Sequence, residues 1–158
     1  MVCSVYFSQY LFEALYRAGR GEAALKLMTA EDDRSWIGMM KQGATITMEA
    51  WNRKVKPNLD WNHAWGATPL NAVSRFLLGV EPIEPGFKKI SIRPQIGWLK
   101  NVEAKVPTVM GPVLIRISPD RLEFDSPAPV EAAFAGVTGE FPSGRHEIVP
   151  QLRQAESP

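Results

Sequence analysis

The feature that most constrains the fold is a change in hydrophobic period close to residue 85. Up to residue 80, apolar residues recur three or four positions apart, which is the spacing of amphipathic helices. From Pro85 onward, apolar and polar residues alternate in short runs such as Val102–Val106 and Val113–Ile117, and proline or glycine separates the runs. Helices followed by strands, without alternation between the two, predict an α+β chain with two parts. The same order argues against a doubly wound nucleotide-binding fold.

The first part is predicted to contain four helices. One runs from Ser4, a favourable N-cap residue, to a stop at Gly19, and a second begins near Gly21, so the short connection predicts an antiparallel helical hairpin. A short third helix covers residues 35–40, and the fourth begins at Thr68, directly before a proline. The expected buried faces carry Phe7, Leu11 and Leu15 on the first helix and Leu70, Val73 and Leu77 on the last.

The second part is predicted to form a small antiparallel β-sandwich domain, because its short alternating runs are regularly separated by breakers. The expected strands cover residues 87–92, 102–106, 113–117, 121–124, 130–134 and 146–149. We place the helical portion at residues 1–84 and the sandwich at residues 85–150, and we expect residues 151–158 to form a disordered tail.

The composition excludes several classes of function. The 18 lysines and arginines nearly balance the 17 aspartates and glutamates, so we expect no electrostatic attraction to nucleic acid or to an anionic membrane. The single cysteine, Cys3, excludes an intrachain disulfide and a cysteine-based metal cluster, and no second histidine or cysteine lies at ligand spacing from His63. No glycine-rich phosphate loop follows a predicted strand. We therefore expect neither a metal nor another cofactor.

The sequence shows no targeting or membrane signal. No apolar run reaches the ~20 residues that a membrane-spanning helix needs. The N-terminus has no basic stretch before its apolar residues, and Gln9 and Glu13 interrupt them, so it is not a signal peptide. It begins abruptly in a predicted helix, which we interpret as the truncated end of something longer. Localisation is left open, since bacterial cytoplasm and periplasm both fit.

Residues 43–69 are rich in side chains suited to carbohydrate chemistry. Within 16 residues, Glu49 is followed by Trp51, Trp61, His63 and Trp65. Indole rings offer flat faces on which sugar rings stack, while a carboxylate or an imidazole bonds sugar hydroxyl groups in a defined direction. The pattern therefore predicts a sugar pocket. Hydrolysis of a glycosidic bond normally requires two carboxyl groups, however, and this segment offers one obvious candidate.

Each of these residues also has an ordinary structural interpretation. For Glu49 the alternative is a surface ion pair with Arg53 or Lys54, since charged side chains are mostly exposed and unspecialised. For His63 it is a hydrogen-bonded structural role, and for the tryptophans it is membership of the core. From the residues alone, these alternatives stay open.

The runs GATITMEAWN and DWNHAWGATPLNAVSRFLLGVEPIEPGFKKISIRPQ strongly resemble the C-terminal part of α-L-rhamnosidases of glycoside hydrolase family 78. The resemblance extends from about Ser4 to about Ile117, and GWLKNVEAKVPTVMGPVLI is similar to the start of the β-sandwich that ends those enzymes. It implies an (α/α)6 barrel that hydrolyses terminal α-L-rhamnosyl residues with inversion at the anomeric carbon. It further implies that Glu49 is the general base and that His63 contacts rhamnose. The other expected substrate contacts are Trp51, Trp61, Asn62 and Trp65.

The chain departs from the family in what it lacks. A barrel of this kind needs twelve helices, whereas about four are predicted here, and the family's general acid lies several helices earlier. The resemblance therefore implies a C-terminal fragment that is inactive by itself. Its expected partners are rhamnose-containing glycosides or polysaccharides and the missing N-terminal part of the same enzyme. The alternatives are a non-catalytic carbohydrate-binding or scaffold module and a fragment of another (α/α)6 glycosidase.

Overall fold

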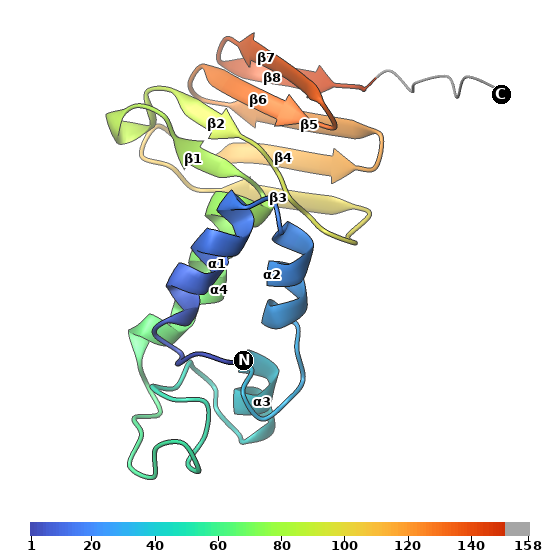
Figure 1. Cartoon of the computed structure of the whole chain (residues 1–158). Coiled ribbons are helices and arrows are strands. Elements are labelled where there is room, and N and C mark those ends of the chain that lie inside the picture. Colours follow the sequence, from blue (N-terminus) through green and yellow to red (C-terminus); the bar gives the residue numbers. More distant parts are fainter. Residues whose placement is uncertain (151–158) are drawn as a thin grey trace, which may run out of the picture. The chain divides into compact units, whose positions relative to one another are not determined.

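The chain divides into two compact units. A computed structural model describes residues 1–150. The helical unit contains Met1–Leu77 together with Gln95–Trp98, and the β unit contains Leu78–Pro94 together with the described residues from Leu99 onward (Figure 1). The expected tail at residues 151–158 lies outside the described residues. The α+β character predicted from the change of period is confirmed.

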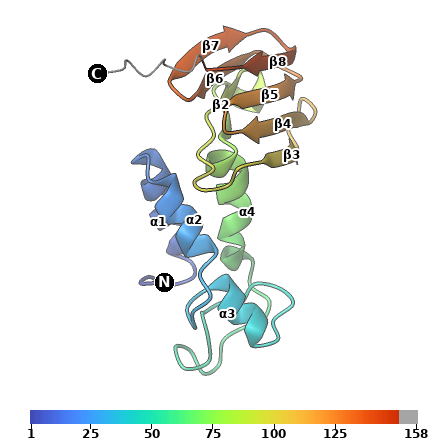
Figure 2. The same cartoon turned by 90° about the vertical axis from the view of Figure 1, so that its right-hand side faces the viewer.

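The helical unit is built on α1 (Ser8–Arg17), α2 (Gly21–Met28), α3 (Trp36–Lys41) and α4 (Thr68–Ala72). α1 and α2 pack against each other after a tight connection (Figures 1 and 2). Gly19 makes this connection with a φ of 68°, a left-handed conformation that suits glycine. The Ser35 hydroxyl caps α3 by accepting a hydrogen bond from the amide of Gly38 at 2.9 Å. The expected hairpin and short third helix are both present.

The buried face of α1 differs from the expected one. Ser8, Phe12 and Tyr16 are buried, whereas Phe7 is 55% exposed. The Tyr16 ring stacks on Phe76 with 5.4 Å between ring centroids, and burial raises the pKa of Tyr16 to about 12. Of the expected face, Leu11 and Leu15 are half-buried and Phe7 is exposed, because the two large aromatic rings, four residues apart, take the interior side of the helix.

The end of α4 departs from prediction because the helix changes its period. α4 continues directly into a π-helical segment, Val73–Leu77, which has more residues per turn than an α-helix. Leu70 is 74% exposed and Val73 is 36% exposed, although both were expected on the buried face. Phe76 and Leu77 are buried. The π turn changes the number of residues per turn within the segment. The buried positions therefore do not follow one constant α-helical spacing from Thr68 to Leu77.

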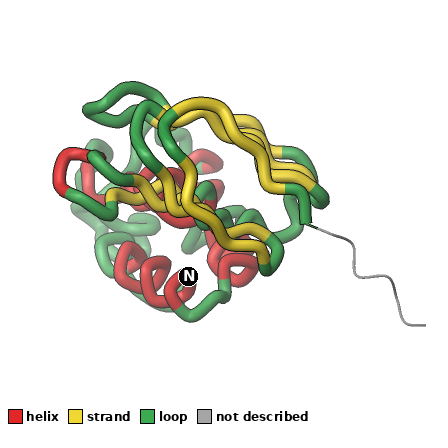
Figure 3. The backbone as a smooth tube through the Cα atoms, turned by 90° about the horizontal axis from the view of Figure 1, so that it is seen from above, coloured by secondary structure: helices red, strands yellow, loops and turns green. Residues whose placement is uncertain are grey.

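Among residues 1–150, the β unit contains two four-stranded sheets (strands are yellow in Figure 3). One has the order β1 (Val80–Pro82), β2 (Ile90–Ile92), β6 (Val130–Phe134) and β7 (Val137–Phe141). The other has the order β3 (Val102–Val106), β4 (Val113–Ser118), β5 (Arg121–Ser126) and β8 (Gly144–Ile148). Adjacent strands are antiparallel, except that β2 and β6 run parallel, which corrects the expectation of a purely antiparallel sandwich.

Alternating residues from both sheets form the core of the β unit. Ile90 and Ile92 are buried in the first sheet, and Ile115 and Phe124 are buried in the second. The Phe124 ring contacts the ring of Phe141, on the other sheet, edge to face at 5.3 Å between centroids. The inner faces therefore pack together as expected of a sandwich.

Two strands give no recognisable signal in the sequence. β1 has three residues and ends in a proline, and it lies in the stretch that was assigned to the helical portion. β7 contains Gly139 between half-buried and exposed residues, so it lacks a clear alternation. Both strands form through pairing with a neighbour rather than through a hydrophobic pattern of their own.

A hydrophobic cluster lies between α3 and the residues that follow it. It contains Val5, Met39, Met48, Trp51 and Leu59. Trp51 is 1% exposed, and its indole Nε1 donates a hydrogen bond to the carbonyl oxygen of Cys3 at 2.7 Å. The cluster therefore joins the N-terminal residues to α3 and to the loop after it.

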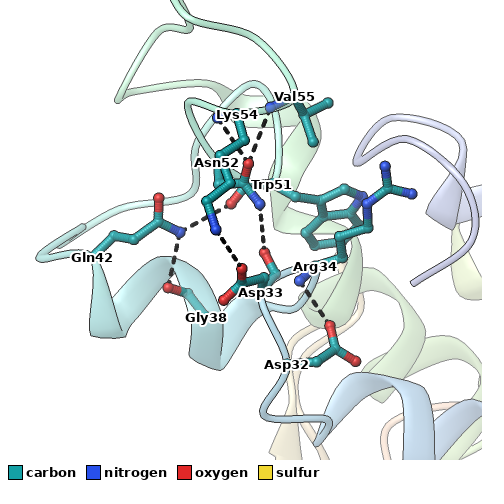
Figure 4. A network of polar contacts seen from close by, with 9 residues as sticks. All are labelled: Asp32, Asp33, Arg34, Gly38, Gln42, Trp51, Asn52, Lys54 and Val55. Carbon is teal, nitrogen blue, oxygen red and sulfur yellow. Dashed lines mark hydrogen bonds and ion pairs between the residues drawn. The ribbon is translucent and has the colours of Figure 1, made fainter.

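Asn52 fastens the start of that loop. Its Oδ1 accepts hydrogen bonds from the amides of Lys54 and Val55, each at 3.0 Å (Figure 4). Its Nδ2 donates to the carbonyl oxygen of Asp33 at 2.9 Å (Figure 4). The side chain is 8% exposed, so these bonds form an Asx turn held in the interior.

Replacement of Gly79 by alanine should destabilise the β unit more than replacement of Gly86. Both glycines have a left-handed backbone, with φ of 72° and 73°, so both variants should lose about 1–2 kcal/mol through strain. A Cβ at Gly79 would also lie 2.2 Å from the backbone of Arg93, whereas a Cβ at Gly86 meets open space. Urea unfolding followed by circular dichroism measures both. Equal losses would contradict the role of close packing at Gly79.

Replacement of Asn52 by alanine should cost about 1–3 kcal/mol of unfolding free energy, because buried polar groups lose their partners. Asn62→Ala is the matched control, since Asn62 is exposed, and it should change stability by less than about 0.5 kcal/mol. Hydrogen exchange of the Lys54 and Val55 amides should accelerate in Asn52→Ala only. An unchanged exchange rate would show that the turn holds without its asparagine.

Candidate functional site

Two short stretches, residues 47–49 and 60–63, run side by side and form the frame of the site. The amide of Glu49 donates to the carbonyl oxygen of Asp60, and the amide of His63 donates to that of Thr47, both at 2.9 Å. The Thr47 hydroxyl also donates to the carbonyl oxygen of His63 at 2.9 Å. Gly66 packs closely here, since a Cβ at this position would lie 2.6 Å from the Cβ of Thr47. The frame places Glu49 and His63 at one site.

Both oxygens of the Glu49 carboxylate have hydrogen-bond partners. Oε1 accepts from Nζ of Lys56, and Oε2 accepts from the backbone amide of Asp60 at 3.1 Å. The Glu49 side chain is 14% exposed. The bond from Lys56, followed by that from Asp60, holds the pKa of Glu49 below its ordinary value. The carboxylate is therefore ionised at neutral pH and still in contact with solvent.

The partner of Glu49 is neither of the two basic residues named as alternatives. Arg53 lies over an indole ring, with 5.3 Å from its guanidinium carbon to the ring centroid. Lys54 pairs with Asp33 at 3.2 Å, and both of these side chains are exposed. Glu49 does form an ion pair, but with Lys56, and its carboxylate is far less exposed than an ordinary surface pair.

His63 and Trp65 lie next to this carboxylate-bearing frame. Their ring centroids are 4.0 Å apart, and Nε1 of Trp65 donates to the carbonyl oxygen of Glu49 at 3.2 Å. Nδ1 of His63 is 3.7 Å from a carboxylate oxygen of Asp60. The Trp65 side chain is 40% exposed and His63 is half-buried. An imidazole and an indole face are thus available to a ligand at this site.

A row of exposed aromatic rings continues from Trp65 to the start of α1, and the sequence analysis missed it. Tyr6 lies 5.2 Å from Trp65 and 5.9 Å from Tyr10, measured between ring centroids, and the two tyrosine hydroxyls are 3.2 Å apart. Phe7 lies 5.6 Å from Tyr10. Four aromatic residues at positions 6, 7, 10 and 12 were a usable signal, but the predicted helix face assigned Phe7 to the core.

The remaining predicted residues have different surroundings. Trp61 is 37% exposed beneath the Arg53 guanidinium, and Asn62 is exposed. Trp51, expected to line the pocket, is buried in the hydrophobic cluster with its Nε1 bonded to a backbone carbonyl oxygen. A buried indole has no free face for a sugar. Trp51 instead anchors the segment that carries Glu49 to the hydrophobic cluster.

The β unit has a groove of its own, of about 530 Å³, on the outer face of β3, β4, β5 and β8. Its lining includes Glu103, Arg116, Glu123 and Arg145. These charges largely pair across strands, with Arg116 at 2.8 Å from Glu103 and Arg145 at 3.6 Å from Glu123. Mutually neutralised charges on a sheet face are typical of a solvated surface, so we place the candidate site at Glu49.

Within residues 1–150, no group of three or more His, Cys, Asp or Glu side chains has an arrangement that could hold a metal ion. No helix in this part of the chain is long and apolar enough to cross a membrane.

Two family models match the chain in succession. The model of the bacterial alpha-L-rhamnosidase 6 hairpin glycosidase domain matches residues 6–77, and that of the bacterial alpha-L-rhamnosidase C-terminal domain matches residues 79–135. The first match contains all of the candidate site residues.

Curated and solved proteins give the same result. An alpha-L-rhamnosidase of Alteromonas sp. (strain LOR) is 34% identical over 113 residues, which cover 65% of this chain and 12% of that relative. The alpha-L-rhamnosidase of Aspergillus terreus has a similar structure, with a TM-score of 0.78 and 21% identity over 89% of this chain and 18% of its own.

Two further solved structures share the fold. That of the Dictyoglumus thermophilum alpha-L-rhamnosidase gives a TM-score of 0.77 at 21% identity, covering 90% of this chain and 20% of its own. The structure of the Streptomyces avermitilis alpha-L-rhamnosidase, solved with L-rhamnose, gives a TM-score of 0.77 at 19% identity and covers 89% of this chain and 17% of its own. The chain thus spans a fifth or less of each relative. The chain belongs to the α-L-rhamnosidase family and corresponds to the C-terminal part of its members.

Proposed function

We propose that this chain supplies the general-base side of an α-L-rhamnosidase active site, with Glu49 as the base of an inverting hydrolysis. The observation that carries the proposal is the state of the Glu49 carboxylate. It is mostly buried, it is kept ionised by Lys56 and the Asp60 amide, and it lies beside the half-buried His63 and the exposed Trp65. A base must be deprotonated at working pH and must reach a water molecule.

The proposed reaction needs a second carboxyl group. In an inverting glycosidase, the base removes a proton from water as that water attacks the anomeric carbon, and an acid protonates the departing oxygen. The two carboxyls stand ~6.5–9.5 Å apart so that the water fits between them. We propose that the acid comes from the rest of the six-hairpin domain, since the chain spans at most a fifth of its relatives. In this proposal, α1 to α4 are closing helices of an (α/α)6 barrel.

The hydrogen bonds around Glu49 leave room for this role. An ionised carboxylate has about four acceptor positions, and Lys56 and the Asp60 amide occupy one on each oxygen. The remaining positions are free to accept the hydrogen bond of an attacking water. Fixing both oxygens also fixes the direction in which the free positions point, which is the geometric requirement for activating water.

The proposed substrate is a rhamnose-containing glycoside or polysaccharide. Trp65 offers a ring face for the apolar side of the sugar, and His63 offers a nitrogen for a hydroxyl group. Asn62 and Trp61 are exposed on the same stretch and extend the proposed contact surface. Tyr6 adds a ring and a hydroxyl adjacent to Trp65.

A second candidate function is sugar binding without hydrolysis. The observation that favours it is the exposed aromatic row from His63 through Trp65 and Tyr6 to Tyr10, which provides stacking surface without requiring a second carboxyl group. The two candidates differ in what the carboxylate does, so the next two experiments separate them.

In an enzyme that joins this chain to the remaining hairpins, Glu49→Gln should lower kcat by about 10²–10⁴-fold and leave KM nearly unchanged, since the amide cannot accept the proton. Glu31→Gln is the matched control, because Glu31 is ion-paired with Lys41 at 2.8 Å and exposed. Release of an aryl rhamnoside measures both. Near-normal kcat in Glu49→Gln would exclude Glu49 as the base.

The chain alone should release negligible product from an aryl rhamnoside, because no acid protonates the leaving oxygen. Addition of L-rhamnose should still change its tryptophan fluorescence, and Trp65→Phe should reduce that change while Trp98→Phe, at another exposed tryptophan, should not. Turnover comparable to that of a complete enzyme would contradict a missing acid. An equal response in both variants would remove Trp65 from the binding surface.

A further inference from the structure

Lys56 is set apart from the other basic residues of its loop. Arg53 lies over the Trp61 ring and Lys54 is paired with Asp33, so neither is directed at Glu49. Lys56 alone among these three contacts the Glu49 carboxylate. A short basic segment, which its composition alone would place in a solvated loop, therefore contains one lysine, Lys56, that makes a specific ion pair with Glu49.

The backbone around Lys56 is held on both sides. Its amide donates to the carbonyl oxygen of Asn52 at 3.2 Å, and its own carbonyl oxygen accepts from the amide of Leu59 at 3.3 Å. Asn52 is anchored to Asp33 by the hydrogen bond from its Nδ2 (Figure 4). Leu59 is buried in the hydrophobic cluster. Lys56 thus extends toward Glu49 from a turn whose backbone is fixed by hydrogen bonds on both sides.

The other titratable groups around the carboxylate do not replace Lys56. Asp60 touches Glu49 through its backbone amide, at 3.1 Å, while its own carboxylate is directed to His63 at 3.7 Å. His63 shares the backbone frame with Glu49 but contacts it by no direct side-chain hydrogen bond in the described chain. Lys56 is therefore the principal positive charge that Glu49 meets.

We propose that Lys56 is a positioning residue for the reaction, which together with the Asp60 amide holds the Glu49 carboxylate in one orientation. This proposal rests on the proposed function of Glu49 as the base. Lys56 and the Asp60 amide occupy one acceptor position on each oxygen, so the directions of the remaining positions are fixed. The hydrogen bond from Lys56 also lowers the pKa of Glu49, ahead of the bond from the Asp60 amide, and this extends the pH range over which the base is deprotonated.

The consequence is a defined pH dependence. The pKa of Glu49 is lowered, so removing the Lys56 charge raises it, and protonation of Glu49 then begins at a higher pH. Below that pKa, the deprotonated fraction falls roughly tenfold for each pH unit. Activity in the joined enzyme should accordingly be lost at a higher pH in Lys56→Met, on the acid side of the profile only.

The test is an NMR titration of the full 158-residue chain with glutamate labelled by ¹³C at the carboxyl carbon. Glu49→Gln identifies the Glu49 signal by its disappearance. The Glu49 midpoint should rise in Lys56→Met, should stay near the original value in Lys56→Arg, which restores the charge, and should not move in Lys54→Met. A purely structural role for Lys56 would not produce this ordering.

Salt provides a measurement that needs no variant. In the unchanged chain, 1 M NaCl should move the Glu49 midpoint only slightly, because a mostly buried contact pair is screened far less than exposed charges. Equal midpoints in the unchanged chain and in Lys56→Met would overturn the proposal. An equal rise in Lys54→Met would also overturn it, because the effect would then come from the charge of the loop as a whole.

The two proposals fail separately. Near-normal kcat in Glu49→Gln removes the base and leaves the titration result standing as a structural fact. An unmoved midpoint in Lys56→Met removes the role of Lys56 and leaves Glu49 as the base. If Lys56→Met does not fold, Lys56→Gln takes its place, and an unmoved Glu49 midpoint in that variant overturns the proposal.

Discussion

The burial of Trp51 is the interaction on which the helical unit and its site depend. The indole fills the space between Met39 of α3 and Leu59 of the following loop, and its nitrogen is bonded to the backbone at Cys3. The N-terminal residues, α3 and the loop are thereby held at one point. Glu49 lies two residues before this anchor, so the position of a mostly buried carboxylate follows from the packing of a neighbouring ring.

Around that anchor, the site combines two kinds of constraint. Backbone bonds between residues 47–49 and 60–63 set the distance between Glu49 and His63, and they involve no side-chain charge. The charge on Lys56 and the Asp60 amide then determine how the carboxylate is oriented and protonated. This separation matters because a substitution of Lys56 can change the orientation and protonation of Glu49 while the backbone bonds between the two stretches stay in place.

The sequence predicted the outline of the fold because hydrophobic period depends on local residues. The change near residue 85, the hairpin around Gly19 and most strands of the sandwich follow from spacing and breakers alone. The buried faces of the helices did not follow, since they depend on which side meets a neighbour. Leu70 and Val73 are apolar and correctly spaced, yet both are exposed. Strand β7 likewise forms only by pairing with β6.

Prediction of the site succeeded and failed for related reasons. The grouping of Glu49, His63 and Trp65 was visible because their residue types are rare and their spacing is short. The burial of Trp51 was not, because an indole suits a core as well as a sugar pocket. Lys56 and Tyr6 were missed because a lysine in a basic loop and a tyrosine at a helix start have no distinctive pattern.

The π turn at Val73–Leu77 has one more consequence. Before it, the Ser8 hydroxyl donates to that of Thr68 at 3.3 Å, and within it Phe76 stacks on Tyr16. A regular α-helix ties the rotational phase of both ends together, so a change at one end twists the other. The wider turn resets this phase within one segment, so that Thr68 before it and Phe76 within it both reach partners on α1.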